Sequence, residues 1–171
     1  MKNKSKKVRL TALTGILCAL ALALSFAEKV FLSAVPLPMG IKPGLSNIIV
    51  MFACSSLGLF PAICIVIMKS GFALIVSGAI SGMISLCGGI FSIITMYILI
   101  RLFKKHVTYI GISVLGAVMH NAGQLTAATI ISSTQLFTGY GPMLLISGII
   151  FGIVTGITMN IIIPHLNRLD I

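Results

Sequence analysis

Charged side chains are scarce in this sequence. Asp, Glu, Lys and Arg make up 8% of its 171 residues, hydrophobic residues make up 58%, and the mean hydropathy is +1.17. Soluble globular domains carry roughly 25% charged residues. A chain of this size cannot hide so much apolar surface from water. The composition therefore excludes a soluble protein and predicts one transmembrane domain over residues 1–171.

Acidic residues are the scarcest charged group, because Glu28 and Asp170 are the two in the sequence. Two distant carboxylates cannot form the clusters that hold Mg²⁺ against a diphosphate. The sequence also lacks a GxxxxGK[ST] phosphate loop and a recognisable set of nucleophile, base and orienting residue. We therefore expect no catalysis by this chain alone, and we assign it no catalytic residue and no cofactor.

Long stretches contain no Asp, Glu, Lys or Arg at all: residues 10–27, 43–68, 70–100 and 106–167. A helix needs about 20 apolar residues to cross the hydrocarbon region of a bilayer. With proline, glycine and charged residues as breaks, the sequence predicts an all-α integral membrane protein. Its six transmembrane helices are expected near residues 10–32, 44–60, 61–80, 82–102, 107–131 and 142–164.

The first segment has an alternative interpretation as a cleaved signal peptide. Lysines precede an apolar run with small residues at its end, as in secretory signals, and cleavage would leave five helices. The apolar run continues past Glu28 and Lys29 to Val35, which favours a retained first helix.

The net charge of +10 comes mainly from the flanks of the predicted helices. Basic residues precede the first segment (Lys2, Lys4, Lys6, Lys7 and Arg9) and separate the fourth from the fifth (Arg101, Lys104 and Lys105), and Arg168 follows the sixth. No soluble domain remains to present a basic face to nucleic acid. The positive-inside rule predicts a multi-pass protein of the cell membrane with both termini cytoplasmic, and the basic flank is expected to contact anionic lipid.

Three lysines remain on the outward half: Lys29, Lys42 and Lys69. Lys69 lies near the centre of its segment, where an ammonium costs about 3 kcal/mol even on lenient insertion scales. It should therefore face protein, a water-filled cavity or an anionic ligand. Snorkelling to the nearer interface is the alternative, which the central position makes harder.

A polar cluster interrupts the fifth segment at His120, Asn121 and Gln124. His120 and Gln124 are one turn apart on one face, and Asn121 points about 100° away. The cluster either lines a cavity or forms hydrogen bonds between helices. A metal site is not expected, because no Cys, Asp or second His lies at ligand spacing from His120.

The second segment opens on Gly44-Leu45-Ser46-Asn47, directly after Lys42 and Pro43. Free N–H groups at a helix start beside a lysine form an anion site, although an ordinary Ser or Asn cap explains the same residues. We predict that an anionic or strongly polar ligand enters from outside. The expected ligand-binding residues are Lys69, His120, Asn121, Gln124, Asn47 and Lys42, with the first four converging on one cavity that opens outward.

Small residues recur every four positions in two segments: Gly15, Ala19, Ala23 and Ala27 in the first, and Gly148, Gly152 and Gly156 in the last. Such rows let helix backbones approach closely in lipid. Packing within the chain explains both rows. A face of the first helix that docks a partner protein, centred on Ala19 and Ala23, is the alternative.

Three stretches resemble the Gx transporter family, whose members are often labelled heptaprenyl diphosphate synthase component I. They are residues 43–48 (PGLSNI), 85–92 (SLCGGIFS) and 111–125 (GISVLGAVMHNAGQL). Relatives tend to show Gly-Leu-Ala-Asn in place of Gly-Leu-Ser-Asn, and often arginine at Lys69. A lysine keeps the charge but loses the bidentate fork of arginine.

That family is in turn similar to the S components of energy-coupling factor (ECF) transporters. The resemblance implies an S-component-like bundle of six helices that captures a small metabolite from outside. It further implies that Ala19 and Ala23, which match an AxxxA docking row, contact a transmembrane coupling subunit that carries two ATPases.

Two other functions stay open. The family label implies a non-catalytic membrane subunit of a heptaprenyl diphosphate synthase, with a ligand from isoprenoid or quinone metabolism. A structural or assembly protein is the third hypothesis, and it predicts no cavity near Lys69 and His120.

Overall fold

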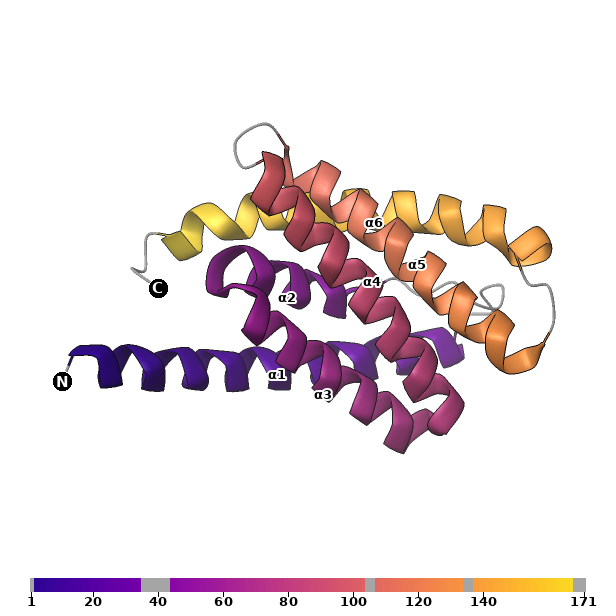
Figure 1. The fold of residues 1–171 in the computed structure, drawn as a ribbon, viewed down its shortest axis with the longest axis horizontal. Helices are drawn as coiled ribbons and strands as arrows, with labels where there is room; N and C mark the ends of the chain where they lie inside the picture. Colours follow the sequence, from indigo (N-terminus) through magenta and orange to yellow (C-terminus); the bar gives the residue numbers. More distant parts are fainter. Residues whose placement is uncertain (1, 35–43, 104–106, 134–136, 168–171) are drawn as a thin grey trace.

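The structure, a computed structural model, describes residues 2–34, 44–103, 107–133 and 137–167 (Figure 1). These residues form helices and no strand, which confirms the all-α class. The helices are α1 (Lys2–Ala34), α2 (Ser46–Phe52), the π-helical turn η1 (Ala53–Leu57), α3 (Leu59–Ser77), α4 (Ala79–Phe103), α5 (Tyr109–Ser132) and α6 (Phe137–Asn167).

Five helices in the described residues are long and apolar enough to cross a membrane. Their spans are Lys6–Leu32, Leu59–Ser77, Ala79–Phe103, Tyr109–Ser132 and Thr138–Pro164. Each covers most of a predicted segment, with ends that differ by several residues. The chain is therefore a multi-pass membrane protein.

The structure does not confirm the second predicted segment, residues 44–60, as a full-length crossing. Its helical part, Ser46–Leu57, reaches about 18 Å at 1.5 Å per residue, against about 30 Å of hydrocarbon. Gly44 and Gly58 bound it with φ angles of 69° and 103°, a left-handed conformation that favours glycine. The segment therefore contributes a half-length helix that begins inside the bundle.

The helices nevertheless alternate in direction as expected for six segments. The start of α1 and the end of α6 lie toward the same end of the bundle, on the left in Figure 1, together with the end of α4. Arg101 in the last turn of α4 therefore lies at the same end as the basic residues at the start of α1. Lys104, Lys105 and Arg168 lie outside the described residues. We refer to this end as the basic end.

The glycine row of α6 packs against α5. A Cβ atom on Gly152 would lie 2.6 Å from the Cα of Val114, and one on Gly156 would lie 2.4 Å from the Cα of Ile110. Backbone atoms cannot move aside as flexible side chains can, so the two helices approach this closely because the row has no side chains. For this row, packing within the chain is the correct interpretation.

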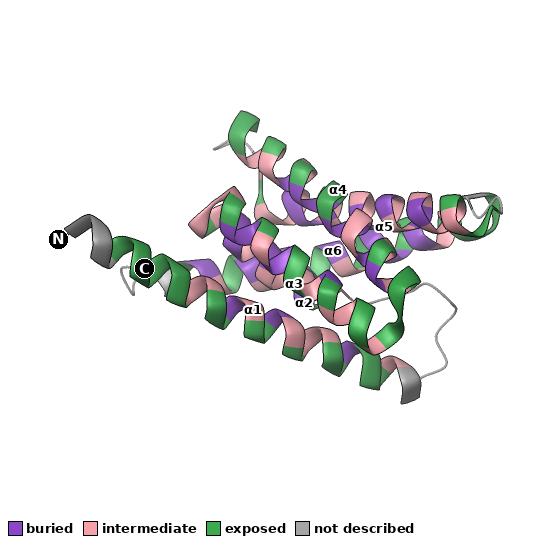
Figure 2. Ribbon diagram, turned by 60° about the horizontal axis from the view of Figure 1, so that its bottom comes forward, coloured by how far each residue is buried: buried purple, intermediate pink, exposed green. Residues whose placement is uncertain are grey.

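The small-residue row of α1 is in a different environment. Helix α1 packs against α2 and α3, and 11% of its most apolar window is buried, against 28–39% in the other four spans. Gly15, Ala19, Ala23 and Ala27 are all exposed, and a Cβ on Gly15 would meet no atom within 4 Å. Figure 2 shows the long exposed face of this helix.

Candidate functional site

A cavity of about 290 Å³ lies inside the helix bundle. All six α-helices or their adjoining residues contribute to its wall, and Phe72, Met96 and Phe151 are among its apolar side chains. Its polar lining residues are Ser25, Glu28, Lys29, Asn47, Lys69, Ser77, Ser81, Ser85, Ser113, His120, Asn121, Gln124, Ser147 and Thr155.

Five of the six residues predicted to bind a ligand line this cavity: Asn47, Lys69, His120, Asn121 and Gln124. Lys42 lies outside the described residues. The sequence alone did not connect the first turn of α2 with the middles of α3 and α5, and the fold brings these three places together.

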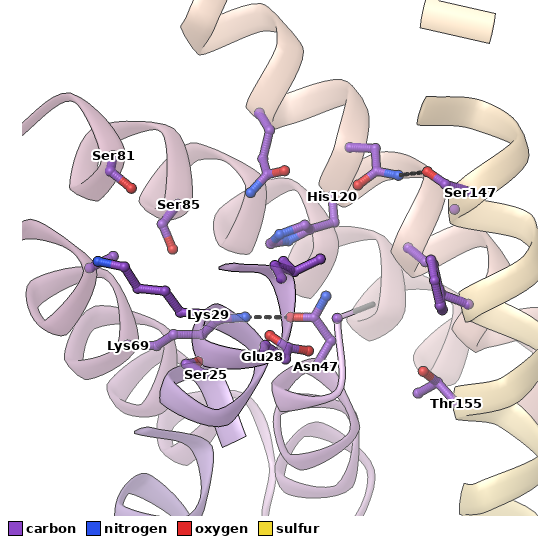
Figure 3. Close-up of a pocket in the computed structure, with 18 of the residues that line it drawn as sticks. Ser25, Glu28, Lys29, Asn47, Lys69, Ser81, Ser85, His120, Ser147 and Thr155 are labelled. Atoms are coloured by element: carbon purple, nitrogen blue, oxygen red, sulfur yellow. Dashed lines mark hydrogen bonds between the residues drawn. The ribbon is translucent and has the colours of Figure 1, made fainter. Parts of the chain in front are cut away.

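Lys69 lies in the middle of α3 and faces the cavity rather than lipid. Its Nζ donates a hydrogen bond of 2.7 Å to Oδ1 of Asn47, as the dashed line in Figure 3 marks. Because Asn47 is in the first turn of α2, this helix begins at the depth of the middle of α3. The half-length helix thus places an amide oxygen beside an ammonium group deep in the bundle.

The sequence predicts an anion site at the start of the second segment. In the structure, the carboxylate of Glu28 in α1 lies at this position. Its side chain is 8% exposed, and its carboxylate accepts a hydrogen bond from the backbone N–H of Leu45, the residue before α2. Leu45 is the N-cap, and no side chain caps the helix, so the expected Ser or Asn cap is not formed. A carboxylate near a helix start is favourable because of the helix dipole.

Glu28 was missed as a site residue, since the sequence identified it only as one of the two acidic residues of the chain. Its position as the one internal acid in the chain was the available signal. Only the fold places it in the cavity wall beside the start of α2 (Figure 3).

Lys29 provides a second cation at the rim of the cavity. Its exposed side chain donates hydrogen bonds of 2.9 Å to the carbonyl oxygen of Val76 and to Oγ of Ser77, in the last turn of α3. A cation at a helix C-terminus interacts favourably with the unpaired carbonyl groups there. Lys29 therefore joins the end of α1 to the end of α3.

The polar cluster of α5 divides between two roles. Nδ2 of Asn121 donates to the carbonyl oxygen of Leu144 at 2.7 Å and to Oγ of Ser147 at 3.5 Å, so Asn121 joins α5 to α6. His120 is 8% exposed and lines the cavity. A Cβ on Gly88 would lie 2.9 Å from the backbone oxygen of His120 and 2.6 Å from Cγ of Gln124, so α4 packs tightly behind these two residues.

The cavity lining is polar and carries charged groups. Two ammonium groups, one carboxylate and many hydroxyl and amide groups leave the lining with a net positive charge when His120 is neutral. The hydroxyl of Ser25 is buried and has no hydrogen-bond partner among the described residues. Most buried polar groups are paired, so such a group in a cavity wall favours a polar ligand.

The described residues contain no group of three His, Cys, Asp or Glu side chains that could hold a metal ion. The cavity residues therefore offer a ligand hydrogen bonds and charge pairs from protein side chains.

Comparison with known families gives one match. A family model described as heptaprenyl diphosphate synthase component I matches residues 17–162, which include all of α2 to α5 and most of α1 and α6. This confirms the resemblance inferred from the three sequence motifs. Comparisons with curated proteins and with solved structures give no match.

The contact between Glu28 and Leu45 predicts a graded effect on stability. Glu28→Leu removes the charged acceptor of this hydrogen bond, so the free energy of unfolding should fall by about 1–3 kcal/mol. Glu28→Gln keeps an oxygen acceptor and should lose about half as much. Thermal unfolding of the purified proteins in detergent measures both. A Glu28→Leu variant as stable as wild type would contradict the contact.

Proposed function

The chain belongs to the heptaprenyl diphosphate synthase component I family, and on this basis we propose that it is a membrane transport protein of the S-component type. In this proposal it binds a small anionic or amphipathic metabolite, of isoprenoid or quinone metabolism, for an ECF-type importer driven by ATP. Partner subunits hydrolyse the ATP, and this chain supplies the binding cavity.

The observation that carries the proposal is a charged side chain in the middle of a transmembrane helix, directed into a polar cavity. A lysine at such a depth costs free energy, and intramembrane ionisable residues typically mark ligand or ion pathways. Lys69 lies there with Asn47, His120 and Gln124 around the same space. The structural or assembly hypothesis predicts no cavity near Lys69 and His120, whereas both residues line one.

The size of the cavity limits the ligand. A volume of about 290 Å³ equals roughly ten water molecules at their share of liquid volume. This volume suits a compact metabolite of vitamin size. The net positive lining favours a ligand with an anionic group close to Lys69, and Phe72 and Phe151 offer apolar contacts to the rest of it.

A transmembrane coupling subunit with two ATPases is the proposed partner. The small-residue row of α1 is exposed, whereas the corresponding row of α6 is buried against α5. A partner helix that packs on Ala19 and Ala23 can approach the α1 backbone closely, as small residues permit in lipid. Helix α1 connects this face to the cavity, because the same helix carries Glu28 and Lys29 in the cavity wall.

The alternative function is a non-catalytic membrane subunit of a heptaprenyl diphosphate synthase. The description of the matching family favours it. With two acidic residues in the whole chain, the Mg²⁺-binding carboxylates would have to come from another subunit. The two functions differ in their partners, which makes co-purification decisive between them.

We expect both termini in the cytoplasm, because the basic residues at the start of α1 and the end of α4 lie at the end of the bundle where α6 also ends. A short cysteine-containing tag at either terminus of a variant without its native cysteines should react with a membrane-impermeant maleimide in lysed cells and not in intact ones. Labelling of one tag in intact cells would refute this topology.

Replacing Lys69 with Met should reduce the retained ligand at least tenfold, because the charged hydrogen-bond donor is lost. Membrane insertion should not suffer, since the change removes an intramembrane charge. Mass spectrometry of small molecules carried through purification measures the retention. Lys69→Arg is the matched control, which keeps the charge and should retain much of the ligand. Equal retention by wild type and Lys69→Met would reject the role of Lys69.

The docking proposal predicts which proteins co-purify. Wild type should carry a transmembrane subunit and two ATPases, and the double variant Ala19→Leu with Ala23→Leu should lose them because the longer side chains hold the partner helix away. Ala79→Leu, at an exposed alanine of α4, is the control and should keep them. Recovery of a soluble, aspartate-rich prenyl synthase instead would favour the alternative function.

A further inference from the structure

A second hollow lies between α1, α2 and α6, separate from the polar cavity. It is a groove of about 280 Å³, and it shares no lining residue with the first cavity. Its lining is wholly apolar: Leu13, Ile16, Leu17, Leu20, Ile48, Ile49, Phe52, Leu57, Met159 and Ile162. In Figure 1, α1 and α6 lie on opposite sides of the short α2.

The groove opens on the outer surface of the bundle. Leu17 and Met159 form part of its buried floor, whereas Ile16 and Leu20 on its α1 side are 58% and 48% exposed. In a membrane protein this surface faces hydrocarbon. Apolar hollows stay dry, and an empty one forfeits the dispersion contacts of its lining. A hydrocarbon chain from the bilayer is therefore the chemically suitable occupant.

Basic residues continue the same face of α1 toward the basic end. Lys6, Arg9, Leu13 and Leu20 follow one another at spacings of three, four and seven residues, which places them along one side of a helix. Lys6 and Arg9 are both exposed. Arg9 lies one turn beyond Leu13, about 6 Å along the axis. An apolar groove thus runs directly toward two cationic side chains.

The dimensions match one leaflet of a bilayer. From Arg9 to Leu20 the helix rises about 16 Å, close to half of the roughly 30 Å hydrocarbon thickness. A lipid whose phosphate lies beside Lys6 and Arg9 would therefore direct its tail along the length of the groove. The charge at one end and the apolar lining along the rest complement the two parts of an anionic lipid.

We propose that this groove binds one acyl chain of an anionic phospholipid from the leaflet at the basic end, with the lipid phosphate held by Lys6 and Arg9. The bound lipid fills the space between α1 and α6 and supports the side of α1 away from α3. The site does not depend on the transport function, because it shares no lining residue with the polar cavity.

The test uses the purified full chain reconstituted in phosphatidylcholine vesicles that contain a minor fraction of phosphatidylglycerol. Native mass spectrometry after mild detergent extraction measures the lipid that stays bound. Wild type should retain one phosphatidylglycerol per chain in preference to phosphatidylcholine. Equal retention of both lipids, or of neither, would overturn the proposal.

Two variants with matched controls separate the head and tail contacts. Lys6→Gln with Arg9→Gln should reduce the preference for phosphatidylglycerol about thirtyfold, given about 1 kcal/mol for each basic residue near a lipid surface. Arg101→Gln, at an exposed arginine of the same end but outside the groove, should leave it unchanged. Equal effects of these two changes would overturn the role of Lys6 and Arg9.

Leu20→Trp places a large ring in the groove and should lower retention of either lipid several-fold. Ile75→Trp, on a surface of α3 that is 81% exposed, is the control and should have no effect. Unchanged retention by Leu20→Trp would overturn the tail site. A prenyl phosphate retained from the cell in place of phospholipid would also overturn the proposal, by assigning the groove to a prenyl chain.

Discussion

A lysine in the middle of a membrane helix is the constraint on which the rest of this structure depends. An ammonium group there needs polar partners, because lipid offers none. The bundle provides one by beginning α2 halfway through, so that Asn47 accepts a hydrogen bond from Lys69. The start of α2 is in turn bonded to the carboxylate of Glu28. Glu28 of α1 and Lys69 of α3 are thus both bonded to the start of α2. Together they form one wall of the cavity.

Helix α1 connects the proposed functions because it presents different residues on different sides. Glu28 and Lys29 contact the cavity and the ends of neighbouring helices, Leu13 and Leu20 line the apolar groove, and the small-residue row faces outward. The helix packs on α2 and α3 and is the least enclosed of the five spans. A partner that displaces α1 would therefore act directly on the cavity wall. In an importer, such a displacement would link docking to ligand release.

Much of the fold followed from composition and spacing. The stretches without charge predicted six crossings, and five of them match full spans among the described residues, because a helix that crosses lipid needs about 20 apolar residues. The second segment was the exception. Its apolar length suggested a crossing, but Gly44 and Gly58 adopt left-handed conformations that end the helix early, and hydropathy does not register backbone conformation. The roles of the two small-residue rows also could not be told apart by spacing, because spacing does not show which helix packs on a row.

The sequence by itself determined that this protein lies in a membrane, that it cannot assemble a carboxylate cluster, and that Lys69, His120 and Gln124 are the polar residues that need an explanation. These conclusions rest on residue type and position along the chain. Only the tertiary structure decided that Asn47 meets Lys69 and that Glu28 holds the start of α2. Those contacts join residues 17 to 22 positions apart on different helices. They depend on where a half-length helix stops in three dimensions, which no local pattern records.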